Sequence, residues 1–171
     1  VDSSLVEGPA SAVISATTSP PELASFPITF AVETSGHTAV GDVDGDLGLD
    51  VIIASDEVHA WHADGLELLN GDGNAQTNGP LTGVSGQFDP AGVTLANLDG
   101  EAGAEIIVSE RGNGYQIQIY KADGTMLPGW PQTLSMWNWA TPAVGDLDGD
   151  GDLEIVVNTL NGRTYAWHHD G

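Results

Sequence analysis

Short apolar runs, separated by acidic or glycine-rich turns, make up the hydrophobic pattern of this chain. Three of the runs are apolar at consecutive positions, namely 51–53, 106–108 and 155–157. Consecutive apolar residues over so short a length, mostly Val and Ile, predict strands with both faces buried. No segment shows the 3.6-residue period of an amphipathic helix. The pattern therefore predicts an all-β protein.

A run of acidic residues precedes each of these strands, and the spacing of the runs indicates a repeat. The runs begin at Asp42, Asn97 and Asp146, which are 55 and 49 residues apart. A period near 50 residues predicts a repeat array or a propeller. The similarity extends beyond the acids, because 58–65 (VHAWHADG) matches 164–171 (TYAWHHDG) and each ends in an Asp-Gly turn signal.

Each repeat predicts four short strands. In the third repeat, one strand enters the acidic run (141–144), one leaves it (154–158) and one carries an aromatic residue (164–167). A fourth contains an aromatic-proline pair, since Phe26 and Trp130 each precede a proline and lie 16 residues before an acidic run. Stacked propeller blades are four-stranded sheets of this kind. We therefore predict three four-stranded propeller blades, as part of a larger ring or of a ring completed by another copy.

The expected boundaries follow from the repeat. Residues 1–25, rich in Ser, Ala, Thr and Pro, predict a linker. The three repeats then cover approximately 26–65, 66–124 and 125–171. This order begins with a fourth strand and ends with a third strand, so that a sheet edge and two apolar faces would be open. We therefore expect self-association, or other propeller segments that complete the ring.

The acidic runs carry the candidate chemistry. Each places oxygen-bearing side chains at positions 1, 3, 5 and 9 and leads directly into a strand. The residues at these positions are Asp42, Asp44, Asp46 and Asp50 in the first run, Asn97, Asp99, Glu101 and Glu105 in the second, and Asp146, Asp148, Asp150 and Glu154 in the third. Like charges this close repel one another unless a cation lies among them. Hard oxygen donors without cysteine suit Ca²⁺ better than zinc or copper, so the runs predict calcium loops.

Three other interpretations of the runs explain less. An EF-hand places its last acid at position 12 and is flanked by helices, whereas here the acid is at position 9 and a strand follows. Simple solvated turns would not need to recur three times in register. A glycosidase carboxylate pair would not explain why acids recur at positions 1, 3, 5 and 9.

The runs at 42–53 and 146–157 share the form Asp-x-Asp-Gly-Asp-x-x-x-Asp/Glu followed by three aliphatic residues. In this form and in its repetition, the chain resembles the FG-GAP repeats of integrin α-subunit propellers and the related bacterial VCBS repeats. The resemblance covers about residues 26–171. It implies four-stranded blades with calcium held between strands 1 and 2, and ligand recognition on the opposite face.

The resemblance also implies one backbone ligand, the carbonyl of position 7, which belongs to Gly48, Gly103 and Asp152 in the three runs. The second run departs from the family pattern. Asn97 is neutral, Glu101 is one methylene longer than aspartate, and glycine is missing at position 6. We therefore expect two strong Ca²⁺ sites and one weaker site.

Most aromatic residues recur at repeat positions, as Trp61, Tyr120 and Trp167 do, and predict packing between blades. Trp137 and Trp139 have no counterpart in the other repeats. In a propeller their connection would lie on the face opposite the calcium loops. They are the candidate ligand-binding residues for a protein or glycan, and coverage of a neighbouring blade is the alternative.

The histidines at 62 and 168 share a repeat position beside Asp-Gly turns. We interpret His62 and His168 as surface or turn residues. The pair His168-His169 could ligate a metal, but no third ligand is evident in the sequence.

The charge balance limits the partners. The 171-residue chain has 25 acidic and 3 basic residues and a net charge of −22, which argues against nucleic acid and anionic membranes. No apolar run reaches 18 residues, so no membrane insertion is expected. Millimolar calcium outside cells favours an extracellular, secreted or cell-surface location.

The expected function is a non-enzymatic calcium-binding module that acts in protein or glycan recognition, in cell adhesion, or as a scaffold. One alternative is the non-catalytic propeller part of a secreted polysaccharide-acting enzyme, and another is a structural repeat of a surface filament or matrix. Lysis of an acidic sugar needs a base, and the only Lys or Arg residues are Arg111, Lys121 and Arg163. No Ser-His-Asp order, phosphate loop or dinucleotide fingerprint is present.

Overall fold

The computed structural model describes residues 36–55, 57–68, 80–81, 90–110 and 114–171. The predicted linker and the strand expected at Phe26 lie outside this part of the chain. Within it, all regular structure is β, in three antiparallel sheets, and the described residues form no helix. The all-β prediction is confirmed. Among the described residues the three sheets are separate and no ring is closed, so the propeller stays a prediction.

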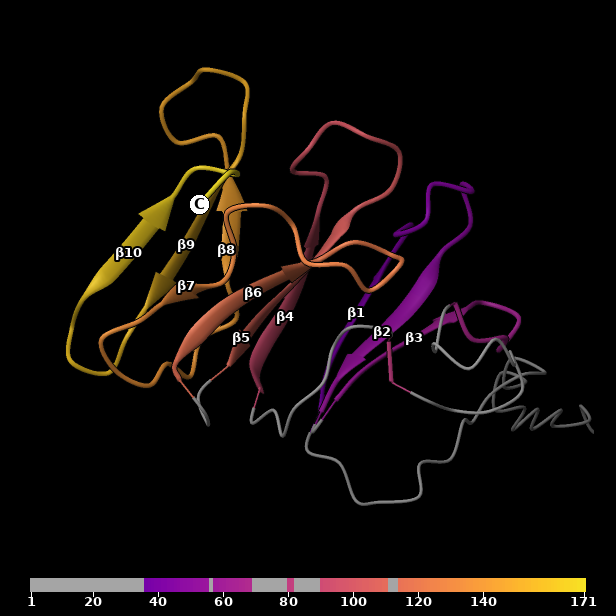
Figure 1. The fold of residues 1–171 in the computed structure, drawn as a ribbon, viewed down its shortest axis with the longest axis horizontal. Helices are drawn as coiled ribbons and strands as arrows, with labels where there is room; N and C mark the ends of the chain where they lie inside the picture. Colours follow the sequence, from indigo (N-terminus) through magenta and orange to yellow (C-terminus); the bar gives the residue numbers. More distant parts are fainter. Residues whose placement is uncertain (1–35, 56, 69–79, 82–89, 111–113) are drawn as a thin grey trace, which may run out of the picture.

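Each sheet is a meander of consecutive strands. The first sheet has the order β1 (His37–Gly41), β2 (Asp50–Ala54), β3 (Val58–His62). The second has the order β4 (Pro90–Ala96), β5 (Glu105–Glu110), β6 (Gln116–Tyr120), β7 (Gln132–Thr133). The third has the order β10 (Thr164–Trp167), β9 (Glu154–Asn158), β8 (Ala143–Gly145). The loops that join the first two strands of each sheet extend from the same end of the molecule, at the top of Figure 1.

The predicted four-strand unit is present in the second sheet, where β7 follows Trp130-Pro131 and pairs with β6. The first sheet has a short equivalent of this fourth strand. After an Asp-Gly turn at Gly65 (φ 83°), Glu67 forms an isolated bridge with Trp61, and the Leu81 amide donates to the Val58 carbonyl at 2.7 Å. Fully buried Leu81 lies in the connection between β3 and β4.

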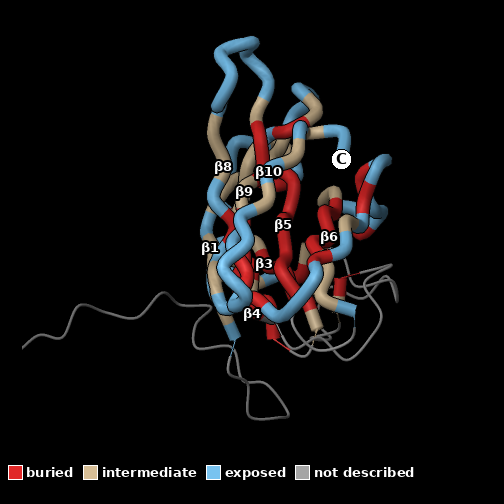
Figure 2. Tube along the Cα trace, turned by 90° about the vertical axis from the view of Figure 1, so that its left-hand side faces the viewer, coloured by how far each residue is buried: buried red, intermediate tan, exposed pale blue. Residues whose placement is uncertain are grey.

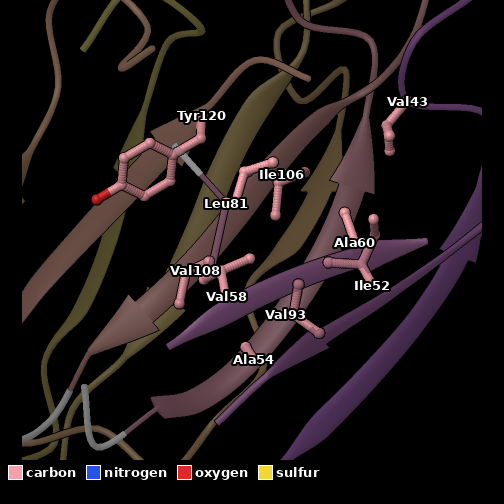
Figure 3. Packing of buried hydrophobic residues seen from close by; sticks show 10 residues of the cluster. All are labelled: Val43, Ile52, Ala54, Val58, Ala60, Leu81, Val93, Ile106, Val108 and Tyr120. Atoms are coloured by element: carbon pink, nitrogen blue, oxygen red, sulfur yellow. The ribbon is translucent and has the colours of Figure 1, made fainter. Parts of the chain in front are cut away.

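The middle sheet is packed on both faces. Ile106 and Val108 of β5 contact the first sheet in one hydrophobic cluster, as Figure 3 shows, whereas Ile107 belongs to a second cluster shared with the third sheet. All six residues of β5 are buried, which is visible along its length in Figure 2. The prediction that both faces are buried is therefore confirmed for this strand.

For β2 and β9, the corresponding strands of the outer sheets, the described residues bury only one face, so burial of the other face stays a prediction that depends on the rest of the ring. In β2, Val51 and Ile53 are only partly buried, and in β9 the same is true of Val156. These residues face away from the middle sheet, and no described sheet packs against them. Consecutive apolar residues indicate that a strand can be buried on both faces. Among the described strands of this kind, only β5 has a sheet packed against each face.

Candidate metal centres

The three acidic loops cover residues 42–50, 97–105 and 146–154, and we call them the first, second and third loop. In each, position 9 is the first residue of the second strand of its sheet, namely Asp50, Glu105 or Glu154. All three of these acids are buried. The β-branched run that follows therefore anchors one acid of each loop at the end of a strand.

The position-9 acid closes its loop by accepting a hydrogen bond from the amide of position 2. The donor-acceptor distances are 2.9 Å from Val43 to Asp50 Oδ2, 2.6 Å from Leu98 to Glu105 Oε2, and 2.7 Å from Leu147 to Glu154 Oε2. Burial raises the pKa of the Asp50 and Glu105 carboxyls. A cation beside them would favour their ionised form.

The position-1 acid shapes the turn in the first and third loops. Asp42 accepts hydrogen bonds from the amides of Gly45 (2.8 Å) and Leu47 (3.0 Å), and Asp146 accepts the equivalent bonds from positions 4 and 6 of the third loop (2.6 and 3.2 Å). Position 6 is left-handed in both loops, at φ 70° for Leu47 and 100° for Gly151. The two loops therefore share one backbone conformation.

The second loop has a different turn. Asn97 has an amide nitrogen where Asp42 and Asp146 have a second acceptor oxygen, and this nitrogen donates to the Glu101 carbonyl at 2.5 Å. Position 6 is not left-handed here, and Gly103 at position 7 adopts φ 96° instead. The carbonyl that the resemblance marks as a ligand therefore belongs to a different backbone turn.

The donor sets of the first and third loops fit a calcium ion. Two groups of carboxylates each have ligand atoms that all lie within 4.8 Å of one another. Their members are Asp42, Asp44 and Asp50 in the first loop, and Asp146, Asp148 and Asp150 in the third. Oxygens bound to Ca²⁺ at 2.3–2.6 Å lie at most about 5 Å apart, so one ion can reach all three. Within the described residues, the acids of the second loop form no such group.

The other predicted ligands are close to these groups. Asp46 belongs to a group with Asp44 and His62, and it accepts the Gly48 amide at 2.6 Å. Asp150 accepts the Asp152 amide at 2.9 Å, in the same way. The position-5 carboxylate therefore fixes the residue at position 7, whose backbone carbonyl is the expected ligand.

Two histidines contribute to the loops, which the sequence interpretation missed. His62 Nδ1 lies 3.0 Å from Asp50 Oδ1, and His168 Nδ1 lies 3.1 Å from Glu154 Oε1. The hydrogen bond with Glu154 raises the pKa of His168. In the first and third loops, the position-9 acid is thus held by a backbone amide on one oxygen and an imidazole on the other. The available signal was the recurrence of these histidines immediately after Trp61 and Trp167.

Lys121 is the equivalent residue of the second sheet, since it follows Tyr120. Its ammonium lies 2.6 Å from Asp99 Oδ2 and 2.9 Å from Glu101 Oε2. The hydrogen bond from Lys121 lowers the pKa of Asp99, and the two carboxylates raise the pKa of Lys121. Positions 3 and 5 of the second loop are therefore paired with a side-chain cation.

The two unmatched tryptophans lie at the opposite end of the third sheet, because the strand β8 separates their connection from the third loop. Trp137 and Trp139 are 46% and 60% exposed. The Trp137 indole donates to the Tyr115 hydroxyl at 2.5 Å, and its carbonyl accepts the Leu160 amide at 3.0 Å. Asn138 between them is fully buried, and its amide has no hydrogen-bond partner in the protein.

Comparison with known proteins bears on the repeat. The FG-GAP-like repeat family matches residues 103–157, which run from the end of the second loop through the whole third loop into β9. This segment, residues 103–157, therefore carries an FG-GAP-like repeat. The resemblance inferred from the acidic runs is confirmed for this segment.

The chain was also compared with solved structures and with curated proteins. The chain is similar to the crystal structure of the V. cholerae biofilm matrix protein Bap1, at 20% identity and a TM-score of 0.38. The match covers 79% of this chain and 27% of Bap1, so the chain spans about a quarter of that protein's length. No curated protein matches the sequence. None of the described segments is a helix long and apolar enough to cross a membrane.

Proposed function

We propose that this chain is a calcium-stabilised β-propeller module that acts in recognition or as a scaffold outside cells, without catalytic activity. The observation that carries the proposal is the matched geometry of the first and third loops in a chain with an FG-GAP-like repeat. Each loop would hold one Ca²⁺ between carboxylates fixed to the ends of two strands. The three sheets would be consecutive blades, completed into a ring by other segments or by another copy.

Calcium is the metal that best suits these loops. Their side-chain ligands are almost all carboxylates, which favours a hard cation, and Ca²⁺ tolerates irregular coordination better than Mg²⁺. The imidazoles of His62 and His168 contact acids and so orient them. An address outside cells, where calcium is millimolar, would keep such exposed loops filled.

Calcium binding can be tested by thermal unfolding with and without chelator. Binding to the native state alone stabilises a protein by about 2.7 kcal/mol per site at a free concentration of 100 Kd. Two such sites would raise Tm by roughly 10–20 °C for a chain of this size. We expect EDTA to lower Tm by that amount and Ca²⁺ in excess, but not equimolar Mg²⁺, to restore it. A Tm that is the same in EDTA and in Ca²⁺ would refute the proposal.

The exposed tryptophans favour glycan recognition as the second candidate function. Trp137 and Trp139 offer flat apolar surface of the kind that stacks on sugar rings, and the amide of Asn138 needs a water or ligand to complete its hydrogen bonds. The net charge of −22 favours a neutral glycan.

A glycan array would test this second function with a matched pair of variants. Replacing Trp137 and Trp139 by alanine should abolish binding and leave the calcium-dependent Tm near that of the wild type. Leu66→Ala, which removes an exposed apolar side chain from the turn after β3, should preserve binding. An equal loss of Tm in EDTA and in Ca²⁺ for the double variant would make the tryptophans packing residues instead.

A further inference from the structure

The second loop does not fit the metal that the other two loops fit. At the position where the first and third sheets present His62 and His168, the second presents Lys121. The histidines contact the acid at position 9, whereas the longer lysine reaches positions 3 and 5, Asp99 and Glu101. Position 3 belongs to the carboxylate group of both other loops, and position 5 belongs to that of the third loop.

We propose that the Lys121 ammonium takes the place of calcium in the second loop, which makes this loop a permanent internal ion pair. The inference rests on the proposed function for the first and third loops, and it sets the chain's capacity at two Ca²⁺ ions.

Charge and distance make the two cations mutually exclusive. The second loop has three carboxylates, on Asp99, Glu101 and Glu105, and the ammonium lies within 2.9 Å of two of them. A calcium ion would need to be 2.3–2.6 Å from the same oxygens. The two positive charges would then be only a few ångströms apart and would repel strongly in a partly shielded site.

The ion pair also contributes to the fold, because the second loop packs against the first loop. The Ala104 amide donates to the Asp42 carbonyl at 2.9 Å. Gly103 packs so closely on Val43 that an added Cβ would lie 2.4 Å from the Val43 carbonyl oxygen. A second loop that needs no metal holds these contacts at any calcium concentration, and it gives the first loop a preformed neighbour.

Counting bound calcium on the 171-residue chain tests the inference. Native mass spectrometry or equilibrium dialysis in saturating Ca²⁺ should find two ions on the wild type. Lys121→Met, which keeps the length of the side chain and removes its charge, should bind three. Arg163→Met is the matched control, because it removes one positive charge from an exposed position in the connection between β9 and β10 and should still bind two.

The outcomes are distinct. Three ions on the wild type, or two on Lys121→Met, would overturn the proposed role of Lys121. No ions on the wild type would instead refute the calcium function itself. If Lys121→Met does not fold, Lys121→His introduces the residue that the other two repeats use, and it should also bind three ions. Two ions on that variant would overturn the proposal.

Discussion

In each sheet, the residue that follows the aromatic residue of the third strand determines which group balances the negative charge of the acidic loop. At this position, an imidazole in the first and third sheets contacts the buried position-9 acid, so the other carboxylates remain available to the proposed metal. An ammonium in the second sheet binds the loop acids directly. This side chain, together with Asn97 and the different turn of the second loop, therefore distinguishes the two loops proposed to bind metal from the one that is not.

Alanine substitution at position 3 should distinguish the two kinds of loop. Asp148→Ala removes a ligand from the third loop, so it should cost one bound ion and about 2.7 kcal/mol of calcium-dependent stability, or 5–10 °C in Tm. In EDTA it should leave Tm unchanged or raise it, because it removes one of several repelling charges. Asp99→Ala removes a partner of Lys121 and should lower Tm equally in EDTA and in Ca²⁺. Calorimetric melts of both variants in both buffers are the measurement.

The opposite pattern would contradict this assignment. If Asp99→Ala lost stability only in Ca²⁺, the second loop would be a metal site. If Asp148→Ala lost stability in EDTA, the third loop would be held by interactions other than calcium.

Tyr120 should make the protein sensitive to alkali. Burial raises the pKa of Tyr120 from 10.0 to about 12. Its neutral form is favoured in the folded state, so stability is fully present below pH 10. As pH rises from 10 towards 12, stability should fall by up to about 1.4 kcal/mol per pH unit. Tyr120→Phe should flatten this decline, as measured by urea unfolding at each pH.

Tyr165→Phe is the control, because the hydrogen bond with Ser135 lowers the pKa of Tyr165. This variant should keep the alkaline decline. A decline that is unchanged in Tyr120→Phe would assign the effect to other groups.

At the scale of elements, the sequence predicted local structure better than contacts. The strands expected at 154–158 and 164–167 have those bounds, and the one expected at 141–144 lies at Ala143–Gly145. Spacing alone also located the position-9 acids. The pairing of Asp50 with His62 was not predictable in this way, because it depends on the register that places the first residue of β2 beside the last residue of β3. Partial burial of the outer sheets likewise depends on what packs against them.

The contact between the first two loops should depend on the glycine at 103. Gly103→Ala would place a Cβ 2.4 Å from the Val43 carbonyl at a left-handed φ of 96°. Gly100→Ala has a similar φ of 74° and no atom within 4 Å, so it should cost only the conformational term, about 1–2 kcal/mol. Gly103→Ala should cost about 1–3 kcal/mol more because of the overlap.

Urea unfolding in EDTA measures both costs. Calcium titration should then show weaker binding at the first loop for Gly103→Ala and unchanged binding at the third. Equal costs for the two variants would mean that the loops do not support one another.

At the scale of the whole molecule, two hydrophobic clusters hold the middle sheet between the others, and each outer sheet keeps one face without a described sheet against it. On the first sheet this face carries Val40, which is 59% exposed and pairs with Val51. On the third it carries the row Ala143, Val156 and Ala166. Blades of a propeller bury such faces against one another.

We therefore expect copies of the chain to associate through these two faces once calcium has reduced their charge repulsion. Light scattering in excess Ca²⁺ at micromolar concentration should give a mass above that of one chain. Val40→Glu places a charge on the open face of the first sheet, and Ala166→Glu places one on that of the third sheet. Each variant should be monomeric when alone, with two calcium ions bound. A mixture of the two should form a dimer of one copy of each, because the intact third sheet of one meets the intact first sheet of the other. If each face instead binds the same face of another copy, each variant would dimerise alone. A wild-type protein that stays monomeric when loaded with calcium would contradict association through either face.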